Sequence, residues 1–347
     1  MRTLILVALL LLALRPARAQ GIHLDLEYAQ ASGISLKLDL FVPQGWSTPR
    51  PVVVWIHSGA WNTGNKEEAR LGAGYLLLRG LAVAAINYRH SYVATFPAQL
   101  HDCKAAVRWL RSRAGIFGLD PGRVGAAGSS AGGHLAALLG TTGLTGRLEG
   151  DVGGNRHFSS AVMAAVDFYG PTDFFQLPPS SLLPGSPESM LIGKPIGEIL
   201  AKRNDPAYAA WVALVQDANP ATHVTSAAAS FHIAHGELDA IVPVGQSRLL
   251  EQALRAANVP VVLREVAGVG HGLPASEADR AFDFLADALM ARSGYAPYGQ
   301  GCSAAGPAPS LDPPPGQWPA IGRTFELELS GLPPLGAPLM ALGFSRR

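Results

Sequence analysis

The chain has 347 residues, 27 basic and 26 acidic side chains, and a hydrophobic content of 48%. This balance excludes a strongly basic nucleic-acid-binding protein and a protein held by charge to an anionic membrane surface. Only two cysteines are present, Cys103 and Cys302. They are too few and too far apart for a disulfide framework or a zinc site, and two readings stay open: one bridge between them, or a buried thiol at Cys103.

The first 19 residues have the pattern of a secretory signal peptide. Arg2 precedes an apolar run from Leu4 to Leu14, and the run is followed by the small-x-small sequence that ends at Ala19. The apolar run is too short to span a bilayer, which disfavours a membrane anchor, and no later stretch is long and apolar enough to do so. We therefore expect a secreted or periplasmic protein, cleaved near Ala19.

From residue 35 the chain alternates apolar runs with amphipathic helical patterns. Strands are expected at 35–43, 51–57, 81–88, 123–128, 161–170, 230–236 and 259–266, and helices at 67–80, 96–115, 130–140, 245–258 and 275–292. Uninterrupted apolar strands separated by helices predict an α/β fold with a mostly parallel central sheet and helices on both faces. The strand at 35–43 alternates with period two, which favours an antiparallel edge strand.

The expected catalytic domain covers residues 20–293, and it contains one long interruption. Residues 174–228 predict a cap insertion after strand 6, the strand at 161–170; a solvent-facing excursion without substrate contact is the alternative. Residues 294–318 are rich in proline and glycine and predict a linker. Residues 319–347 predict a short β-rich tail, which either docks on the main domain or begins an incomplete C-terminal module.

A glycine-rich stretch, "VGAAGSSAGGHLAAL" at 124–138, contains the pattern G-x-S-x-G between an apolar strand and a helix. In that context the central residue, Ser130, occupies a strained turn that presents its hydroxyl, and Ser129 is a bystander. The helix that follows supplies free N–H groups and the positive end of its dipole. The alternative is a turn that only packs a helix on a strand. We predict Ser130 as a nucleophile.

A serine nucleophile needs a base and a carboxylate that orients the base. In this kind of sheet the partners follow in the order Ser, acid, His, each after a later strand. Asp239 follows the strand at 230–236, and His271 lies between two glycines after the last strand. We predict Asp239 and His271 in these roles. The residues that we weigh against them are His101 and His235 as bases, Asp167, Asp173 and Glu237 as acids, and His134, which we expect to be a structural hydrogen-bonding residue.

Acyl transfer also needs donors for a developing oxyanion. The loop "IHSGAWNTGNK" at 56–66 follows a strand and has small residues where backbone N–H groups must approach a substrate oxygen. The predicted donors are the N–H groups of Gly59, Ala60 and Ala131. An ordinary turn at the end of a strand is the alternative.

Together, "HSGAW", "GSSAGGHLAALLG", "FYGPTD", "HGELDAIVPVGQS" and "GVGHG" resemble motifs of one protein group. The chain resembles the α/β-hydrolase esterases and lipases related to hormone-sensitive lipase, nearest the secreted feruloyl and acetyl-xylan esterases, over residues 24–292. The resemblance implies an α/β-hydrolase fold and ester hydrolysis by Ser130, Asp239 and His271 without a metal or cofactor. The tail resembles a C-terminal β-module of secreted bacterial proteins.

The loop of that family reads His-Gly-Gly-Gly-Trp, whereas this chain has Ser58 and Ala60 at two of the glycine positions. Ser58 could add a hydroxyl donor, so we assign Ser58 and Trp61 to substrate binding. The expected substrates are short-chain or aromatic acyl esters, free or linked to a polysaccharide. Alternatives are an amidase, arylformamidase or peptidase with the same triad, an aromatic polyester hydrolase, and a non-catalytic binding protein on the same scaffold.

Overall fold

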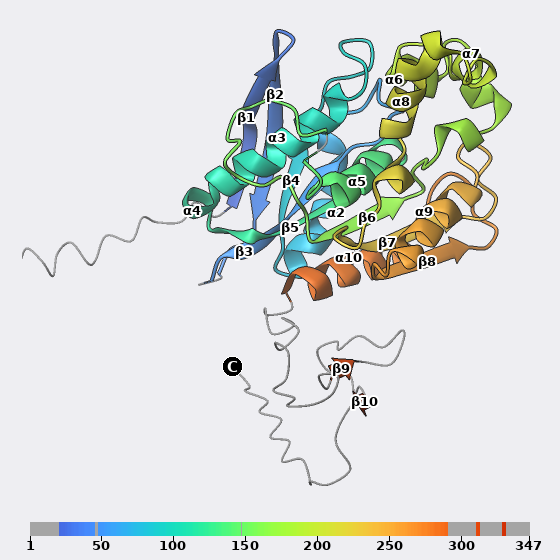
Figure 1. Ribbon diagram of the computed structural model, residues 1–347. Helices are drawn as coiled ribbons and strands as arrows, with labels where there is room; N and C mark the ends of the chain where they lie inside the picture. Colours follow the sequence, from blue (N-terminus) through green and yellow to red (C-terminus); the bar gives the residue numbers. More distant parts are fainter. Residues whose placement is uncertain (1–20, 46–47, 147, 291–309, 313–327, 331–347) are drawn as a thin grey trace, which may run out of the picture. The chain divides into compact units, whose positions relative to one another are not determined.

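A computed structural model describes residues 21–45, 48–146, 148–290, 310–312 and 328–330 (Figure 1). The predicted signal peptide, Cys302 and most of the predicted linker and tail lie outside the described residues. The chain divides into two compact units, 1–290 and 291–347. In the second unit, the described residues form one antiparallel pair of strands, β9 (Ser310–Asp312) and β10 (Glu328–Ser330).

The first unit is built around an eight-stranded sheet with the order β1-β2-β4-β3-β5-β6-β7-β8. Its strands are β1 (Gly21–Ala31), β2 (Ile34–Val42), β3 (Arg50–Ile56), β4 (Ala82–Ile86), β5 (Leu119–Ser129), β6 (Ala164–Phe168), β7 (Ser230–Gly236) and β8 (Val261–Val266). The strands from β3 to β8 are parallel, whereas β1 and β2 are antiparallel additions. The predicted fold class is confirmed.

The edge of the sheet differs from the expectation. The strand expected at the edge, observed as β2, pairs with β4 on one side and with β1 on the other. Ser32 and Gly33 both have positive φ angles, 51° and 74°, and a two-residue turn of this kind joins antiparallel strands in a hairpin. The hairpin folds residues 21–31 back along β2, so β1 is the edge.

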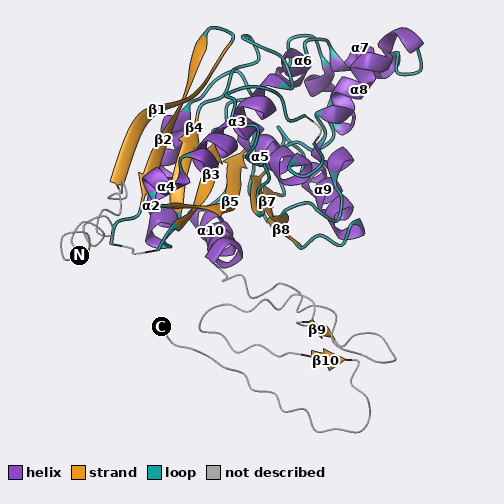
Figure 2. Cartoon of the chain, turned by 60° about the vertical axis from the view of Figure 1, so that its left-hand side comes forward, coloured by secondary structure: helices purple, strands orange, loops and turns teal. Residues whose placement is uncertain are grey.

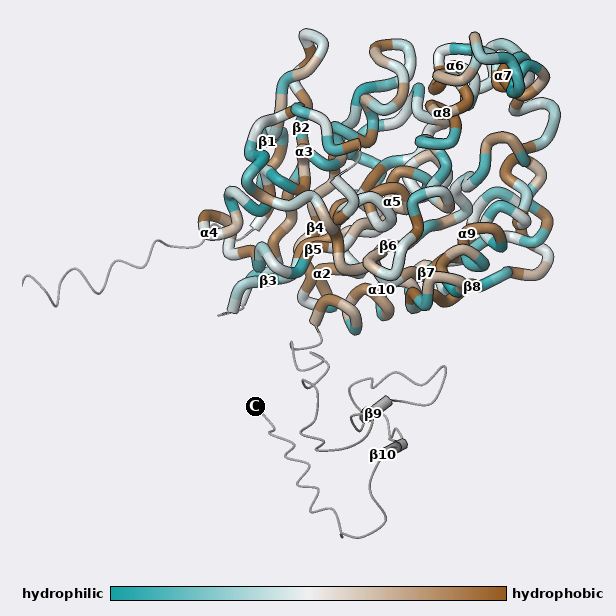
Figure 3. The backbone as a smooth tube through the Cα atoms, viewed as in Figure 1, coloured by the Kyte–Doolittle hydropathy of each residue, from teal (hydrophilic) through white to brown (hydrophobic). Residues whose placement is uncertain are grey.

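Helices cover both faces of the sheet (Figure 2). One face carries α3 (Ala98–Ser112), α5 (Ala131–Thr142) and α9 (Gly245–Ala256), and the other carries α2 (Arg70–Leu78) and α10 (Ala275–Met290). A short α4 (Ala114–Phe117) leads into β5. Strands β4 and β5 and helix α5 are strongly hydrophobic (Figure 3), as expected for elements that are buried in the core. Cys103 of α3 is part of this buried core.

The segment after β6 forms a group of short helices, which both ribbon views place together at one end of the unit (Figures 1 and 2). It comprises η2 (Phe174–Gln176), η3 (Pro179–Leu182), α6 (Pro187–Ile192), α7 (Ile196–Ala201), η4 (Pro206–Tyr208), α8 (Ala209–Asp217) and η5 (Pro220–His223). Both ends of the segment are held together: Asn219 donates to Asp173 Oδ1, and Gln246 Oε1 of α9 accepts from the N–H groups of Thr172 and Asp173. None of the described helices combines the length and apolarity needed to cross a bilayer.

Candidate active site

Ser130 lies in the turn between β5 and α5 with a backbone conformation that few residues other than glycine adopt. Its φ and ψ angles are 53° and −118°. The turn is held by two backbone hydrogen bonds: Ser130 N–H donates to Phe168 O of β6 at 2.8 Å, and Ser130 O accepts from His134 N–H at 3.0 Å. The surrounding structure thus stabilises a strained, half-buried serine at the carboxyl ends of the parallel strands.

Glycines beside Ser130 allow three backbone segments to approach closely. A Cβ atom on Gly132 would lie 2.1 Å from Ile56 O of β3, and one on Gly128 would lie 2.5 Å from the carbonyl of Gly132. A Cβ atom on Gly133 would lie 2.3 Å from Asp167 Oδ1 of β6. Any side chain at these positions would push α5 away from the sheet, so the pattern G-x-S-x-G reflects steric requirements of this turn.

The structure brings Ser130, His271 and Asp239 into one hydrogen-bonded chain. Ser130 Oγ lies 3.0 Å from His271 Nε2, and His271 Nδ1 lies 2.6 Å from Asp239 Oδ2. Because Asp239 is a carboxylate acceptor, Nδ1 carries the imidazole proton and Nε2 is free to accept the serine proton. The His271 side chain is 21% exposed, whereas Asp239 is fully buried.

Four donors surround the Asp239 carboxylate. Its Oδ1 accepts from the N–H groups of Ile241 and Val242, both at 2.9 Å. Its Oδ2 accepts from His271 and lies 3.2 Å from Nε2 of the buried His235. His235 Nε2 also donates to Val242 O at 2.7 Å, and its Nδ1 accepts from the Ser247 hydroxyl. His235 therefore contacts the acid rather than the serine.

The loop after β3 contains the other predicted group of donors. Gly59, Ala60 and Trp61 have successive positive φ angles of 104°, 53° and 57°, which turn the loop sharply. Gly59 O accepts from the N–H groups of Asn62 and Thr63. Among the residues that the structure describes, no acceptor is recorded for the N–H groups of Gly59, Ala60 or Ala131. Free N–H groups of this kind are available to a negative oxygen.

Ser58 and Trp61 have protein partners in this structure. The Ser58 hydroxyl donates to Glu68 Oε2 at 2.7 Å, and the Trp61 indole N–H donates to His134 Nδ1 at 3.2 Å. Trp61 is only 2% exposed, and His134 Nε2 donates in turn to Ala218 O at 2.7 Å. Their assignment to substrate binding stays a prediction, and these contacts give both side chains a role in holding the loop.

The acids that we weighed against Asp239 have other surroundings. Asp167 is fully buried beneath the turn, where its Oδ1 accepts from Gly170 N–H and its Oδ2 has no recorded partner within the described residues. Burial raises the pKa of Asp167 from 3.8 to about 7. Asp173 caps η2 and binds Asn219. Neither carboxylate is recorded in contact with His271.

Burial lowers the pKa of two histidines, His57 at the start of the loop and His134 in α5, from 6.5 to about 4. His57 stacks on Tyr88 with 4.1 Å between ring centroids, and its Nδ1 donates to Ser58 O. Both rings are thus neutral hydrogen-bonding groups at neutral pH.

Sequence reasoning missed two features of the site: the role of Glu68, and the contact of His235 with Asp239. Both depend on pairings between separate segments, for which no local pattern exists.

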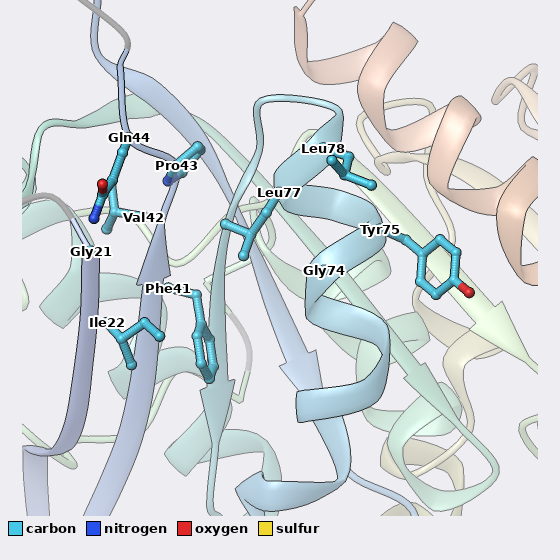
Figure 4. Close-up of a pocket in the computed structure, with 10 residues that line it drawn as sticks. All are labelled: Gly21, Ile22, Phe41, Val42, Pro43, Gln44, Gly74, Tyr75, Leu77 and Leu78. Carbon is cyan, nitrogen blue, oxygen red and sulfur yellow. The ribbon is translucent and has the colours of Figure 1, made fainter.

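A hollow of about 920 Å³ lies at a different place, between β1, β2 and α2 (Figure 4). Its lining includes Ile22, Phe41, Tyr75 and Leu78. Phe41 pairs with Val83 near the start of β4. Ser130 follows the carboxyl end of the parallel strand β5, so the hollow and the serine lie at opposite ends of the parallel strands.

Known proteins with similar sequences are ester hydrolases by name. The chain is 34% identical over 251 residues to the probable carboxylic ester hydrolase LipM and 30% identical over 230 residues to esterase LipC, both of Mycobacterium tuberculosis. These alignments cover 71% and 65% of this chain and 52% and 53% of the two relatives. The chain therefore spans about half the length of the curated relatives it matches.

Solved structures give the same fold. A truncated carbohydrate esterase from gut microbiota is 30% identical, with a TM-score of 0.68 over 78% of this chain and 97% of that one. A bifunctional GH43-CE protein of Bacteroides eggerthii is 35% identical, with a TM-score of 0.66 over 76% of this chain and 38% of that one. Apo esterase 2 of Thermogutta terrifontis, at 24% identity and a TM-score of 0.62 over 78% of this chain and 95% of that one, supports the fold alone.

The predicted resemblance to α/β-hydrolases of the hormone-sensitive lipase type is confirmed at the level of the family. The BD-FAE family profile matches residues 38–254, which is more than half of the chain and includes Ser130 and Asp239. The parallel sheet, the strained serine turn and the esterase relatives agree with this match. The chain belongs to the BD-FAE family of α/β-hydrolases.

Proposed function

We propose that this chain is a serine carboxylesterase that acts through Ser130, His271 and Asp239. The observation that carries the proposal is the hydrogen-bonded chain from Ser130 Oγ through His271 to Asp239, with contacts of 3.0 and 2.6 Å. The names of the relatives, carboxylic ester hydrolase and esterase, support ester hydrolysis as the reaction.

We assign each residue a separate role in this reaction. His271 Nε2 takes the proton of Ser130 as the hydroxyl oxygen bonds to the ester carbonyl carbon. Asp239 keeps the imidazole in the required tautomer and stabilises the imidazolium. The N–H groups of Gly59, Ala60 and Ala131 stabilise the negative carbonyl oxygen. His271 then protonates the departing alkoxide, which leaves as the alcohol, and later activates the water that releases the acid from Ser130.

For the substrate, we propose short-chain or aromatic acyl esters of hydroxyl-rich alcohols, including carbohydrate-linked esters. Two solved structures that are 30% and 35% identical are described as a carbohydrate esterase and a GH43-CE protein, which supports this class. We further propose that the protein is exported, because residues 1–19 have the pattern of a cleavable signal peptide.

The first test is turnover of p-nitrophenyl acetate and butyrate, followed by labelling of Ser130 with a fluorophosphonate probe. We expect turnover and labelling in the wild-type protein. Failure of both would leave a non-catalytic binding protein as the better interpretation.

A second test compares acetylated xylan, methyl ferulate and short p-nitrophenyl esters with the matching amides. Turnover of the ester panel supports the proposed class. Activity confined to long acyl chains would contradict the proposed acyl group, and faster cleavage of amides than of esters would favour an amidase or peptidase.

A further inference from the structure

The predicted oxyanion donors come from two separate segments. Gly59 and Ala60 lie in the loop after β3, whereas Ala131 begins α5 after β5. The two strands are parallel neighbours, with Ile56 paired to Gly128 at their ends. Beyond this pair the distance between the two segments depends on the packing of Gly132 against Ile56 O and on side-chain contacts that join the segments.

One carboxylate bridges the two segments. Glu68 Oε2 accepts from Ser58 N–H at 2.9 Å and from the Ser58 hydroxyl at 2.7 Å, and Glu68 Oε1 accepts from the Ser129 hydroxyl at 3.4 Å. Ser58 immediately precedes the donor Gly59, and Ser129 immediately precedes the nucleophile Ser130. Glu68 thus contacts each segment one residue before the group that acts on the substrate.

The segment that carries Glu68 is itself firmly held. It is the short helix η1 (Lys66–Ala69), and its buried Lys66 ammonium pairs with Asp39 at 2.7 Å and with Asp25 at 3.2 Å. The Lys66 N–H also donates to Asn87 Oδ1 after β4. Because the helix is anchored, the Glu68 side chain can hold the loop that it contacts in a fixed position.

The negative charge of Glu68 would not by itself favour catalysis. A carboxylate beside a site where a negative oxygen forms opposes that oxygen electrostatically, so a gain for catalysis must come from geometry. We propose that Glu68 is a positioning residue that sets the separation of the two halves of the oxyanion hole. This inference rests on the proposed function, because it assumes that Ser130 attacks a carbonyl.

Glutamine separates geometry from charge. In Glu68→Gln, the amide oxygen can still accept from Ser58, and the amide N–H₂ can donate to the Ser129 oxygen. Alanine removes both contacts. Since loss of a whole oxyanion donor costs about 10²- to 10³-fold in kcat, we expect misplacement in Glu68→Ala to cost about tenfold, with KM changed by less than about twofold. Glu68→Gln should keep kcat within about threefold of the wild type.

The experiment measures kcat and KM for p-nitrophenyl acetate and the rate of fluorophosphonate labelling of Ser130 in the full chain. Glu67→Ala, an exposed neighbour in the same helix, is the matched control and should behave as the wild type. The thermal unfolding midpoint of each variant shows whether the fold persists. Labelling tests the positioning role even if the chosen ester is a poor substrate, because the probe also reacts through the oxyanion hole.

Three outcomes would overturn the inference: wild-type kcat and labelling in Glu68→Ala, equal losses in Glu68→Gln and Glu68→Ala, or a loss confined to KM.

Ser58→Ala provides a second test. If Ser58 and Glu68 act as one unit, the double variant should lose less than the product of the two single losses, and fully multiplicative losses would contradict it. No turnover and no labelling in the wild type would instead overturn the proposed function itself.

Discussion

The serine turn and the loop at 57–61 after β3 both lie where the parallel strands end, yet different forces shape them. Around Ser130 the conformation is determined by backbone contacts. Gly128 and Gly132 allow backbone segments to approach more closely than a Cβ atom would permit, and main-chain hydrogen bonds hold the strained Ser130. The loop at 57–61 is tied mainly by side chains, through Glu68 on one side and His134 on the other. Backbone packing tolerates almost no substitution, whereas side-chain ties should give graded losses.

The largest effect should come from removing the reactive hydroxyl. Ser130→Ala should lower kcat by about 10⁴-fold or more, because His271 then has no nucleophile to activate. Turnover of p-nitrophenyl butyrate under saturating conditions measures the loss. Ser129→Ala is the matched control and should lose at most about tenfold, because its hydroxyl contacts Glu68 and Tyr169 and is not part of the hydrogen-bonded chain from Ser130 to His271. Equal losses in the two variants would contradict the assignment of Ser130.

Gly132→Ala tests the backbone half of the comparison. The new methyl group would meet Ile56 O at 2.1 Å and His57 O at 2.6 Å, and neither backbone oxygen can move freely. We expect the free energy of unfolding to fall by about 3 kcal/mol or more, with a large loss of activity. Urea denaturation measures the first quantity. Gly115→Ala in α4, where a Cβ atom meets nothing within 4 Å, should be neutral or slightly stabilising. Similar values for the two variants would refute the steric argument.

Trp61→Phe tests the side-chain half. The substitution keeps a buried ring but removes the N–H that donates to His134 Nδ1. We expect a loss of about 1–2 kcal/mol in the free energy of unfolding, because a buried acceptor is left unpaired, and a loss of kcat of about threefold. Trp109→Phe in α3 is the control, since its ring packs on Phe117 far along the chain from the loop. If Trp61→Phe lowered the free energy of unfolding as much as Gly132→Ala, the proposed difference between side-chain and backbone contacts would be contradicted.

The two regions should also respond to pH with opposite signs. Asp167, beneath the serine turn, has its pKa raised to about 7, so its contribution to folding stability is lost as pH rises from about 4 to 7. His57 at the start of the loop and His134, which bonds to the loop, have pKa values lowered to about 4, so their contribution to folding stability is lost as pH falls from 6.5 to 4.

Asp167→Asn isolates the first of these effects. Asparagine can still accept from Gly170 N–H but carries no charge, so the variant should gain stability relative to the wild type as pH rises, by up to about 4 kcal/mol above pH 7. Urea denaturation between pH 4 and 8 measures the difference, and activity should change little. A difference that does not vary with pH would show that Asp167 is ionised in the folded protein throughout.

The same contrast explains what the sequence could predict. The serine turn has a local signature, because glycines at fixed positions are required wherever a strand, a tight turn and a helix approach closely. The order of Ser130, Asp239 and His271 follows from the order of parallel strands, whose carboxyl ends meet at one edge. The fold class was predictable for the same reason, since buried parallel strands are apolar throughout.

The contacts of the loop could not be predicted in this way. Glu68 is one of two adjacent glutamates, and only the folded chain shows that Glu68 accepts from the Ser58 hydroxyl. His235 was weighed as an alternative base, and in the structure its Nε2 lies 3.2 Å from Asp239 Oδ2. The edge strand β1 was missed because its partner on β2 is set by the Ser32–Gly33 turn rather than by continuous apolar character.

The anchoring of the helical segment after β6 has a consequence for how such a protein can diversify. The segment begins at Asp173 and ends at Asn219, and these two side chains bond to each other, so both ends of the segment are fixed at one place. A loop with joined ends can change its length at little entropic cost. The chain between them can therefore be lengthened, shortened or exchanged over evolutionary time while the residues around Ser130 keep their positions.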